Sequence, residues 1–214
     1  IWVKKMKRLL YFLNILIINT SLLFNKMEEI FYELYGDDIA VVELNCGHIE
    51  SDIDELWKFK PEESQYCKMY GKDIKIPRKM VTLGKTYNFN GSDNSVGELE
   101  DFGYLSECIV LGQPLSRYNS CLVNFYEDGS EYIGYHSDKT NGICEDSTIV
   151  ISSFGETRVL RLQHNESKQT FDLILPHGSR FEFTQETNKK YKHCIVKSKK
   201  IKGKRISITY RNMK

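Results

Sequence analysis

The stretch Asn124-Phe-Tyr-Glu-Asp-Gly-Ser-Glu-Tyr-Ile-Gly-Tyr-His136-Ser-Asp138 decides how the rest of the chain is interpreted. It ends in His-x-Asp, and in a strand or at a strand end residues i and i+2 point to the same face. An imidazole and a carboxylate on one face are two ligands for a divalent metal, and the distant His193 is the candidate for a third. Two histidines and one carboxylate with open coordination positions suit non-haem Fe(II). Because His-x-Asp alone is a weak motif, the flanking sequence has to decide.

From Ser120 onward the sequence is typical of a β protein. Short segments of alternating apolar residues are separated by Gly, Asp, Asn or Pro, as expected for strands joined by turns. The predicted strands are 121–126, 132–136, 148–154, 158–163, 171–175, 180–184, 193–197 and 205–211. About eight strands with few helices predict a closed barrel or a double-sheet jelly roll.

The part of the chain before Ser120 is more mixed. We expect helices at 30–35, 51–58 and 98–111, strands at 40–44, 77–84 and 86–91, and polar loops at 62–76 and 91–97. Ser51 is a suitable N-cap for the second helix, and Pro61 ends it. The predicted fold class is therefore β-rich α+β, a jelly roll with flanking helices.

The N-terminal residues are interpreted as lying outside the folded domain. Residues 9–24 are apolar and follow four basic residues, as in a signal peptide. The run is short for a membrane span of roughly 20 residues, and no A-x-A-like site follows it. We interpret residues 1–27 as an upstream, non-core extension, with targeting as the alternative. Residues 28–214 are expected to form one domain, with an N-terminal extension and lid at 28–115 and the β core at 116–214.

The net charge of +1 identifies no partner, but the charges are unevenly distributed. Twelve acidic residues and two lysines lie between Glu28 and Ser64, whereas eleven Lys or Arg and one Glu lie between Glu186 and Lys214. The basic region is either a nucleic-acid-facing surface or an ordinary solvated face. Six cysteines without a C-x-x-C pair indicate reduced thiols. We expect an intracellular monomer without stable membrane association.

Two further segments are consistent with a binding pocket. Alternation places Leu122, Asn124 and Tyr126 on one face of a strand. It also places two arginines on one face of the segment Arg205-Ile-Ser-Ile-Thr-Tyr-Arg211, opposite the isoleucines. If that strand is buried, its guanidinium groups need an anionic partner. A dicarboxylate is suitable, because arginine binds carboxylates through two parallel hydrogen bonds.

Taken in order, N-x-Y, H-x-D, a distal His and R-x-S-x-T-x-R resemble the AlkB family of Fe(II)- and 2-oxoglutarate-dependent dioxygenases. The resemblance runs from Pro77 to Arg211, and the joint pattern is far more specific than any single motif. It implies a double-stranded β-helix that uses Fe(II), with 2-oxoglutarate and O2 as co-substrates. It implies that the iron ligands are His136, Asp138 and His193. The residues implied to hold 2-oxoglutarate are Leu122, Asn124, Tyr126, Arg205, Ser207 and Arg211.

The segment from Pro77 to Gly91 resembles the nucleotide-recognition lid of the members that repair DNA and RNA. The resemblance implies a recognition hairpin here and substrate contacts from a set of basic and aromatic residues: Arg78, Lys79, Tyr87, Phe89 and Arg158. Basic groups would contact phosphates, and an aromatic ring could stack on a base. Periodicity alone instead favours Tyr87 and Phe89 as core residues of an ordinary hairpin.

The resemblance implies oxidative demethylation of N-alkylated nucleobases in DNA or RNA, as in alkylation damage repair, on a flipped or single-stranded base. One alternative is a dioxygenase that modifies a protein or a small molecule. Another is a non-catalytic nucleic-acid-binding module, which would have no need for three ligands and two pocket arginines. The chain departs from the family at Lys139-Thr-Asn141, where an acidic run is usual, and at Ser179. These departures leave the preferred base open.

Overall fold

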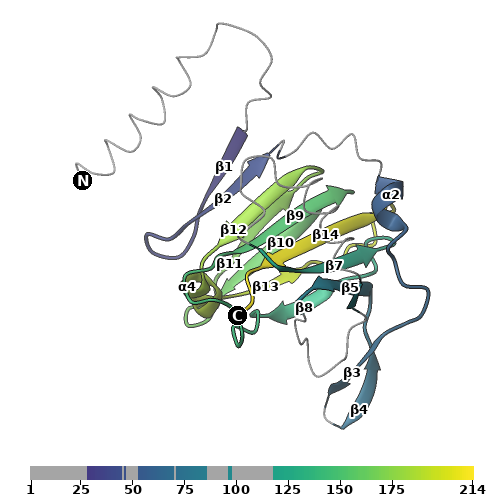
Figure 1. Ribbon diagram of the computed structural model, residues 1–214. Coiled ribbons are helices and arrows are strands. Elements are labelled where there is room, and N and C mark those ends of the chain that lie inside the picture. Colours follow the sequence, from purple (N-terminus) through teal and green to yellow (C-terminus); the bar gives the residue numbers. More distant parts are fainter. Residues whose placement is uncertain (1–27, 45, 47–52, 70, 86–95, 98–117) are drawn as a thin grey trace, which may run out of the picture.

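The computed structural model describes residues 28–44, 46, 53–69, 71–85, 96–97 and 118–214. Two facing sheets, antiparallel apart from the β5–β6 pair, form a jelly roll, which confirms the predicted fold class (Figure 1). The order of the major sheet is β1 (Glu28–Glu33), β2 (Ile39–Leu44), β12 (Ser179–Phe183), β9 (Ile149–Gly155), β14 (Arg205–Arg211), β7 (Ser120–Tyr126), β5 (Lys79–Gly84) and β6 (Val96–Gly97). The order of the minor sheet is β11 (Thr170–Leu175), β10 (Arg158–His164), β13 (Tyr191–Ile195) and β8 (Ile133–His136).

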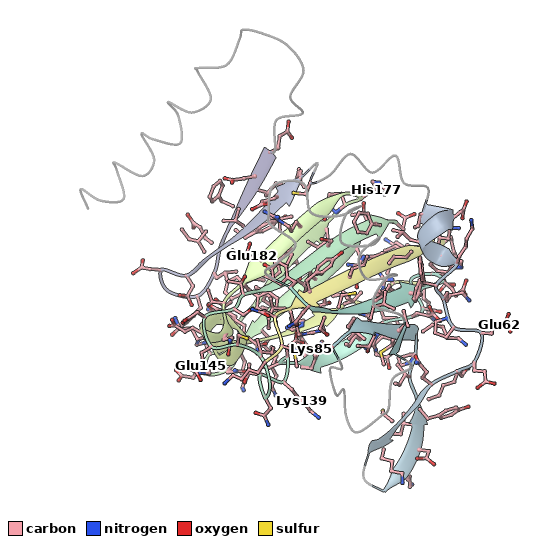
Figure 2. The ribbon with its side chains drawn as sticks, in the orientation of Figure 1. Glu62, Lys85, Lys139, Glu145, His177 and Glu182 are labelled. Carbon is pink, nitrogen blue, oxygen red and sulfur yellow. The ribbon has the colours of Figure 1, made fainter. Side chains whose placement is uncertain are left out.

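The main core lies between the two sheets. Alternate residues of each strand face inward, so that Ile151 and Phe181 of the major sheet and Leu160 and Leu173 of the minor sheet belong to one buried cluster. A second cluster covers the outer face of the major sheet, where Leu56 of helix α2 (Ile53–Trp57) packs on it. Figure 2 shows side chains filling the space between the sheets. Both faces of the central strands are therefore buried, which explains why β7 and β14 are buried at every position.

The structure confirms the eight strands predicted after Ser120, the strands predicted at 40–44 and 77–84, and the helix predicted at 51–58, within the usual uncertainty of element ends. The helix predicted at 30–35 is wrong, because this segment forms β1. Its burial alternates with a period of two, and it pairs with β2 across a turn at Gly36, which has a φ of +68°. Helix α4 (Gln185–Lys190) has no counterpart in the sequence prediction.

The loop predicted at 62–76 is also wrong. It contains β3 (Tyr66–Met69) and β4 (Lys72–Lys75), which, among the strands that the structure describes, pair only with each other. The turn between them is at Gly71, where φ is +74°. In Figure 1 this hairpin projects away from the jelly roll, beyond β5. Its polar composition made it look like a loop, because β4 is exposed at every position and the buried Cys67 of β3 adds little apolar sequence.

Several predictions fall on residues outside those that the structure describes. These are the extension at 1–27, the N-cap Ser51, the strand at 86–91, most of the loop at 91–97 and the helix at 98–111. They remain predictions. Within the described part of the chain, none of the helices has both the length and the apolar character required to cross a membrane.

Candidate metal and co-substrate site

Three potential metal ligands converge at the inner face of the minor sheet. The ligand atoms of His136, Asp138 and His193 all lie within 4.8 Å of one another. Oδ1 of Asp138 is 3.6 Å from Nε2 of His136 and 3.7 Å from Nε2 of His193. The structure thus brings together the three residues that the sequence singled out, although two of them are separated by more than fifty positions.

Strand pairing explains why the two imidazoles meet. His136 ends β8 and lies directly opposite His193 of β13 in the antiparallel register. The register then shifts between His193 and Ile195, which marks a β-bulge or similar irregularity beside the site. Bulges redirect side chains and are frequent next to active sites. The ring centroids of the two histidines are 4.2 Å apart, and the rings are inclined at 54°.

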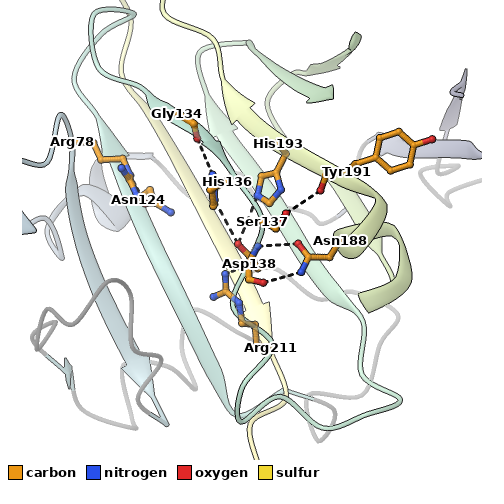
Figure 3. Close-up of polar contacts among 10 residues, drawn as sticks. All are labelled: Arg78, Asn124, Gly134, His136, Ser137, Asp138, Asn188, Tyr191, His193 and Arg211. Carbon is orange, nitrogen blue, oxygen red and sulfur yellow. Dashed lines mark hydrogen bonds and ion pairs between the residues drawn. The ribbon is translucent and has the colours of Figure 1, made fainter. Parts of the chain in front are cut away.

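Neighbouring groups orient two of the three ligands, His136 and Asp138 (Figure 3). Nδ1 of His136 is 2.9 Å from the carbonyl oxygen of Gly134, so this nitrogen donates and Nε2 is the ring nitrogen that faces Asp138. Arg211 donates to Oδ2 of Asp138 at 2.6 Å and leaves Oδ1 facing the histidines. The side chain of Asn188 bonds both backbone groups of Asp138.

The electrostatic surroundings favour the protonation states that bind metals. Burial and the neighbouring His136 lower the pKa of His193 to about 3, so its imidazole is neutral at neutral pH. Burial alone would raise the pKa of Asp138, but Arg211 and the two histidines outweigh it and hold that pKa well below its ordinary value. A neutral imidazole and an ionised carboxylate are the states that a divalent metal requires.

The predicted co-substrate residues line the inner face of the major sheet. Registers across β7, β14 and β9 place Asn124, Ser207 and Ser153 in one row and Tyr126 opposite Arg205 in the next. Leu122 instead packs in a small cluster with Met80 and with the root of the β3–β4 hairpin. All of these side chains are buried. The face thus combines a cation, a phenol, an amide and hydroxyls.

Arg205 is the side chain of this face that is best suited to bind an anion. Its side chain is 0% exposed, and Nε donates to Oγ of Ser153 at 2.9 Å. Neither terminal nitrogen has a hydrogen-bond partner among the described residues. Burial lowers the pKa of Arg205 to about 10, against an opposing effect of Tyr126. A buried guanidinium in this state is a ready binding group for a carboxylate.

The structure places Arg78 in the same buried region and not on a lid surface. Its side chain is only 4% exposed, and Nε donates to Oδ1 of Asn124 at 2.7 Å. The bond fixes the orientation of the Asn124 amide, so that Nδ2 remains available as a donor. Arg78 therefore contacts a predicted co-substrate residue, and its predicted contact with a phosphate stays a prediction.

Arg158 also differs from the expectation of a substrate contact. It is 1% exposed, and its guanidinium donates to the backbone carbonyls of Asp128, Glu131 and Val196. This arrangement fastens the 127–131 loop, because three carbonyls share one cation. Lys79 donates to the carbonyl of Glu62 at 2.5 Å on the exposed side. Tyr87 and Phe89 lie outside the described residues.

Three residues of the site were not among the predicted ones. Ser153 binds Arg205, Asn188 binds the backbone of Asp138, and Thr209 lies on the inner face of β14 between Leu122 and Ile151. Thr209 could have been found from the alternation of β14 alone. Ser153 and Asn188 depend on registers between distant strands and helices, for which the sequence holds no local signal.

The arrangement fits a ferrous ion and a dicarboxylate. Two imidazoles and one carboxylate form the donor set of a non-haem Fe(II) site. The terminal nitrogens of Arg205 offer a bidentate partner for a carboxylate, on a face that also carries Tyr126 and Asn124. The fold and the site together define a metal-dependent oxygenase of the jelly-roll type.

Comparison with known proteins leads to the same class. Residues 62–211 match the 2OG-Fe(II) oxygenase superfamily, and the chain belongs to that family. Within it the chain is AlkB-like, an Fe(II)- and 2-oxoglutarate-dependent dioxygenase that uses O2.

The DNA oxidative demethylase ALKBH2 of Bos taurus is 28% identical over 196 residues, which cover 79% of this chain and 69% of that protein. The Homo sapiens ALKBH2 is 27% identical over 192 residues, covering 79% and 74%. The uncharacterized protein R406 of Acanthamoeba polyphaga mimivirus is 29% identical over 162 residues, covering 73% and 84%. The solved structure of OsALKBH1 has a TM-score of 0.54 and 17% identity, covering 81% of this chain and 96% of that one, and shows a shared fold.

Proposed function

We propose that this dioxygenase removes N-alkyl groups from nucleobases, with alkylated DNA as the first substrate to test. The AlkB-like family gives the chemistry, and the names of the mammalian relatives describe DNA oxidative demethylases. When bound, the iron and 2-oxoglutarate would activate O2: one oxygen atom would hydroxylate an N-methyl carbon, and the other would go into succinate as 2-oxoglutarate loses CO2. The hydroxylated carbon then leaves as formaldehyde and restores the base.

In this proposal His136, Asp138 and His193 hold the iron. Arg205 binds the distal carboxylate of 2-oxoglutarate, and the unpartnered state of its terminal nitrogens is the observation that carries the assignment. Tyr126 and Asn124 line the same pocket. Arg211 keeps Asp138 ionised and oriented. Buried on both sides by the sheets, these residues exclude water from the co-substrate.

The β3–β4 hairpin supports a nucleic-acid substrate. Tyr66 and Ile74 are 55% and 43% exposed on a hairpin that pairs with no further strand in the described part of the chain. Its exposed cations are Lys68, Lys72 and Lys75. The root of the hairpin packs on Met80 and Leu122, and Leu122 belongs to β7, the strand that also carries Asn124. A projecting element with basic and apolar side chains, rooted at the pocket, is suited to phosphates and bases.

A second basic surface adjoins the root of the hairpin. The amide of Tyr132 donates to the carbonyl of Pro77 at 3.3 Å, and Nζ of Lys197 lies 5.4 Å from the centre of the Tyr132 ring. The connection from β13 to β14 continues with exposed cations, Lys199, Lys200 and Lys202. This placement favours the interpretation of the basic region as a nucleic-acid-facing surface.

We also propose that residues 28–214 act as one monomeric, intracellular domain.

The test is to incubate the protein with Fe(II), 2-oxoglutarate and oligonucleotides that contain 1-methyladenine, 3-methylcytosine or N6-methyladenine. Mass spectrometry of the bases, with succinate and formaldehyde release, measures turnover. Formaldehyde release that depends on the methylated oligonucleotide supports the proposal, and parallel DNA and RNA strands identify the substrate class. Succinate formation that never depends on any oligonucleotide would favour a protein or small-molecule substrate instead.

Two variants separate chemistry from substrate binding. His136→Ala should abolish turnover, because the iron loses a ligand. The triple variant Lys68→Ala, Lys72→Ala and Lys75→Ala should weaken oligonucleotide binding and reduce its salt dependence by about 0.9 in log–log slope per lost phosphate contact. Its 2-oxoglutarate affinity should not change, because the hairpin tip lies outside the pocket. A triple variant with unchanged oligonucleotide affinity would remove the hairpin from the proposal.

A further inference from the structure

Asn188 makes a reciprocal pair of hydrogen bonds with the backbone of Asp138. Its Oδ1 accepts from the Asp138 amide at 2.9 Å, and its Nδ2 donates to the Asp138 carbonyl at 2.8 Å (Figure 3). Asn188 is 3% exposed and is the buried residue of α4. Both bonds are buried, and together they use one donor and one acceptor of the amide side chain.

The bonds replace strand pairing at the point where pairing stops. β8 ends at His136, so Asp138 lies two residues beyond the ladder that β8 forms with β13. A buried peptide group without a partner costs about 1–3 kcal/mol. The Asn188 amide satisfies both peptide groups and holds the Asp138 backbone in one place, as a neighbouring strand would.

The same contact ties the ligands to each other. Helix α4 leads directly into β13, and Asn188 precedes His193 by five residues. The Asp138 backbone is therefore fastened to the segment that carries the second histidine. Arg211 fastens the other end of the residue by binding Oδ2 at 2.6 Å. With its backbone and one oxygen fixed, Asp138 can direct only Oδ1 to the two imidazoles.

We propose that Asn188 is a positioning residue of the metal site and sets the affinity for the divalent ion through the Asp138 backbone. The inference rests on the iron site of the proposed function. Partners of metal ligands typically contribute 10–100-fold to metal affinity. Asn188 touches no ligand atom, so its effect arises only from the placement of the Asp138 main chain.

The experiment is to measure binding of Mn(II) to the metal-free protein by the electron paramagnetic resonance signal of free Mn(II). Asn188→Ala removes both hydrogen bonds. Asn188→Asp keeps the shape and one acceptor but sets a carboxylate oxygen against the Asp138 carbonyl. Both variants should raise the Mn(II) dissociation constant by about 10–100-fold, and circular dichroism confirms that each is folded. If Asn188→Ala does not fold, Asn188→Asp alone decides.

Thr184→Ala is the matched control. Thr184 is the N-cap of α4 and accepts a hydrogen bond from the amide of Thr187 at 3.1 Å. Losing this cap costs about 0.5–2 kcal/mol of stability but leaves the bonds to Asp138 in place. The control should bind Mn(II) within about threefold of the unsubstituted protein.

The outcomes separate the two proposals. Mn(II) binding by the unsubstituted protein, lost in His136→Ala, supports the iron site. The inference about Asn188 is overturned if the folded Asn188 variants bind Mn(II) as tightly as the unsubstituted protein. It is also overturned if Thr184→Ala weakens binding as much as they do. Absence of Mn(II) binding to the unsubstituted protein would overturn the proposed site and, with it, the inference.

Discussion

Replacing Arg205 with methionine should change stability and co-substrate binding in opposite directions. In the ligand-free protein this guanidinium is fully buried, and its two terminal nitrogens have no hydrogen-bond partner among the described residues. Methionine has a similar length and no charge to desolvate. The Arg205→Met protein without ligand should therefore be more stable than the unsubstituted one, whereas its affinity for 2-oxoglutarate should fall sharply.

The magnitudes follow from the burial of the charge. The pKa of Arg205 is lowered to about 10, chiefly by burial, which corresponds to a cost on the order of 3 kcal/mol for the uncompensated cation. Replacing buried charges with apolar groups of similar volume stabilises proteins by up to about 1–4 kcal/mol. Leaving a buried carboxylate without its cation costs about 3–5 kcal/mol, or at least about 100-fold in affinity.

Denaturant unfolding of the metal-free protein measures the stability change, and calorimetric titration of 2-oxoglutarate into the Mn(II)-loaded protein measures affinity. Arg158→Met is the matched control, because this buried guanidinium already binds three carbonyls. The control should lose at least about 2 kcal/mol of stability. If Arg205→Met bound 2-oxoglutarate within about threefold of the unsubstituted protein, the assignment of Arg205 would be refuted.

Three further substitutions test other contacts. Arg78→Met removes the bond to Asn124 and should raise the dissociation constant of 2-oxoglutarate by about tenfold without changing Mn(II) affinity, as calorimetry can show. Asp38→Asn tests a pH effect, because the hydrogen bond from Tyr191 lowers the pKa of Asp38 in the folded protein. The ionised Asp38 therefore stabilises the fold above about pH 4, and this stabilisation is lost as the pH falls through the pKa that Asp38 has in the folded protein. Urea unfolding across that range should show a shallower acid decline for the variant. Gly84→Ala should lower the melting temperature, because Gly84 has a φ of +76° and a Cβ there meets the carbonyl oxygen of Asn119, costing at least about 1–2 kcal/mol.

Alternation predicted the strands well because the jelly roll buries one face of most strands and both faces of its central ones. In β10 every second residue is buried, and this period of two is the one by which strands are predicted from a sequence. The three metal ligands could be predicted for a different reason. The first two form the short His-x-Asp motif, and His193 is the third ligand that the family pattern implies. The inner face of β14 followed directly from its alternate isoleucines.

What the sequence could not supply was long-range register. Asn188 and Asp138 are 50 residues apart, and Arg205 and Ser153 are 52 apart. Nothing local distinguishes Arg78, whose guanidinium reaches a pocket amide, from Arg158, whose guanidinium fastens a loop. The segment of β1 was wrongly predicted as a helix because its local sequence is ambiguous. Its six residues include three glutamates and a short apolar run, and such a segment fits a helix or a strand equally well.

The position of β14 has a consequence for the synthesis of the protein. β14 lies between β7 and β9 in the middle of the major sheet, yet it follows both of them in the sequence, with four other strands after β9. Until residues 205–211 have left the ribosome, β7 and β9 each present an open hydrogen-bonding edge, and such edges invite aggregation. The same segment carries Arg205 and Arg211. The nascent chain therefore acquires its closed sheet and its charged pocket in one late step, when it is most dependent on chaperones.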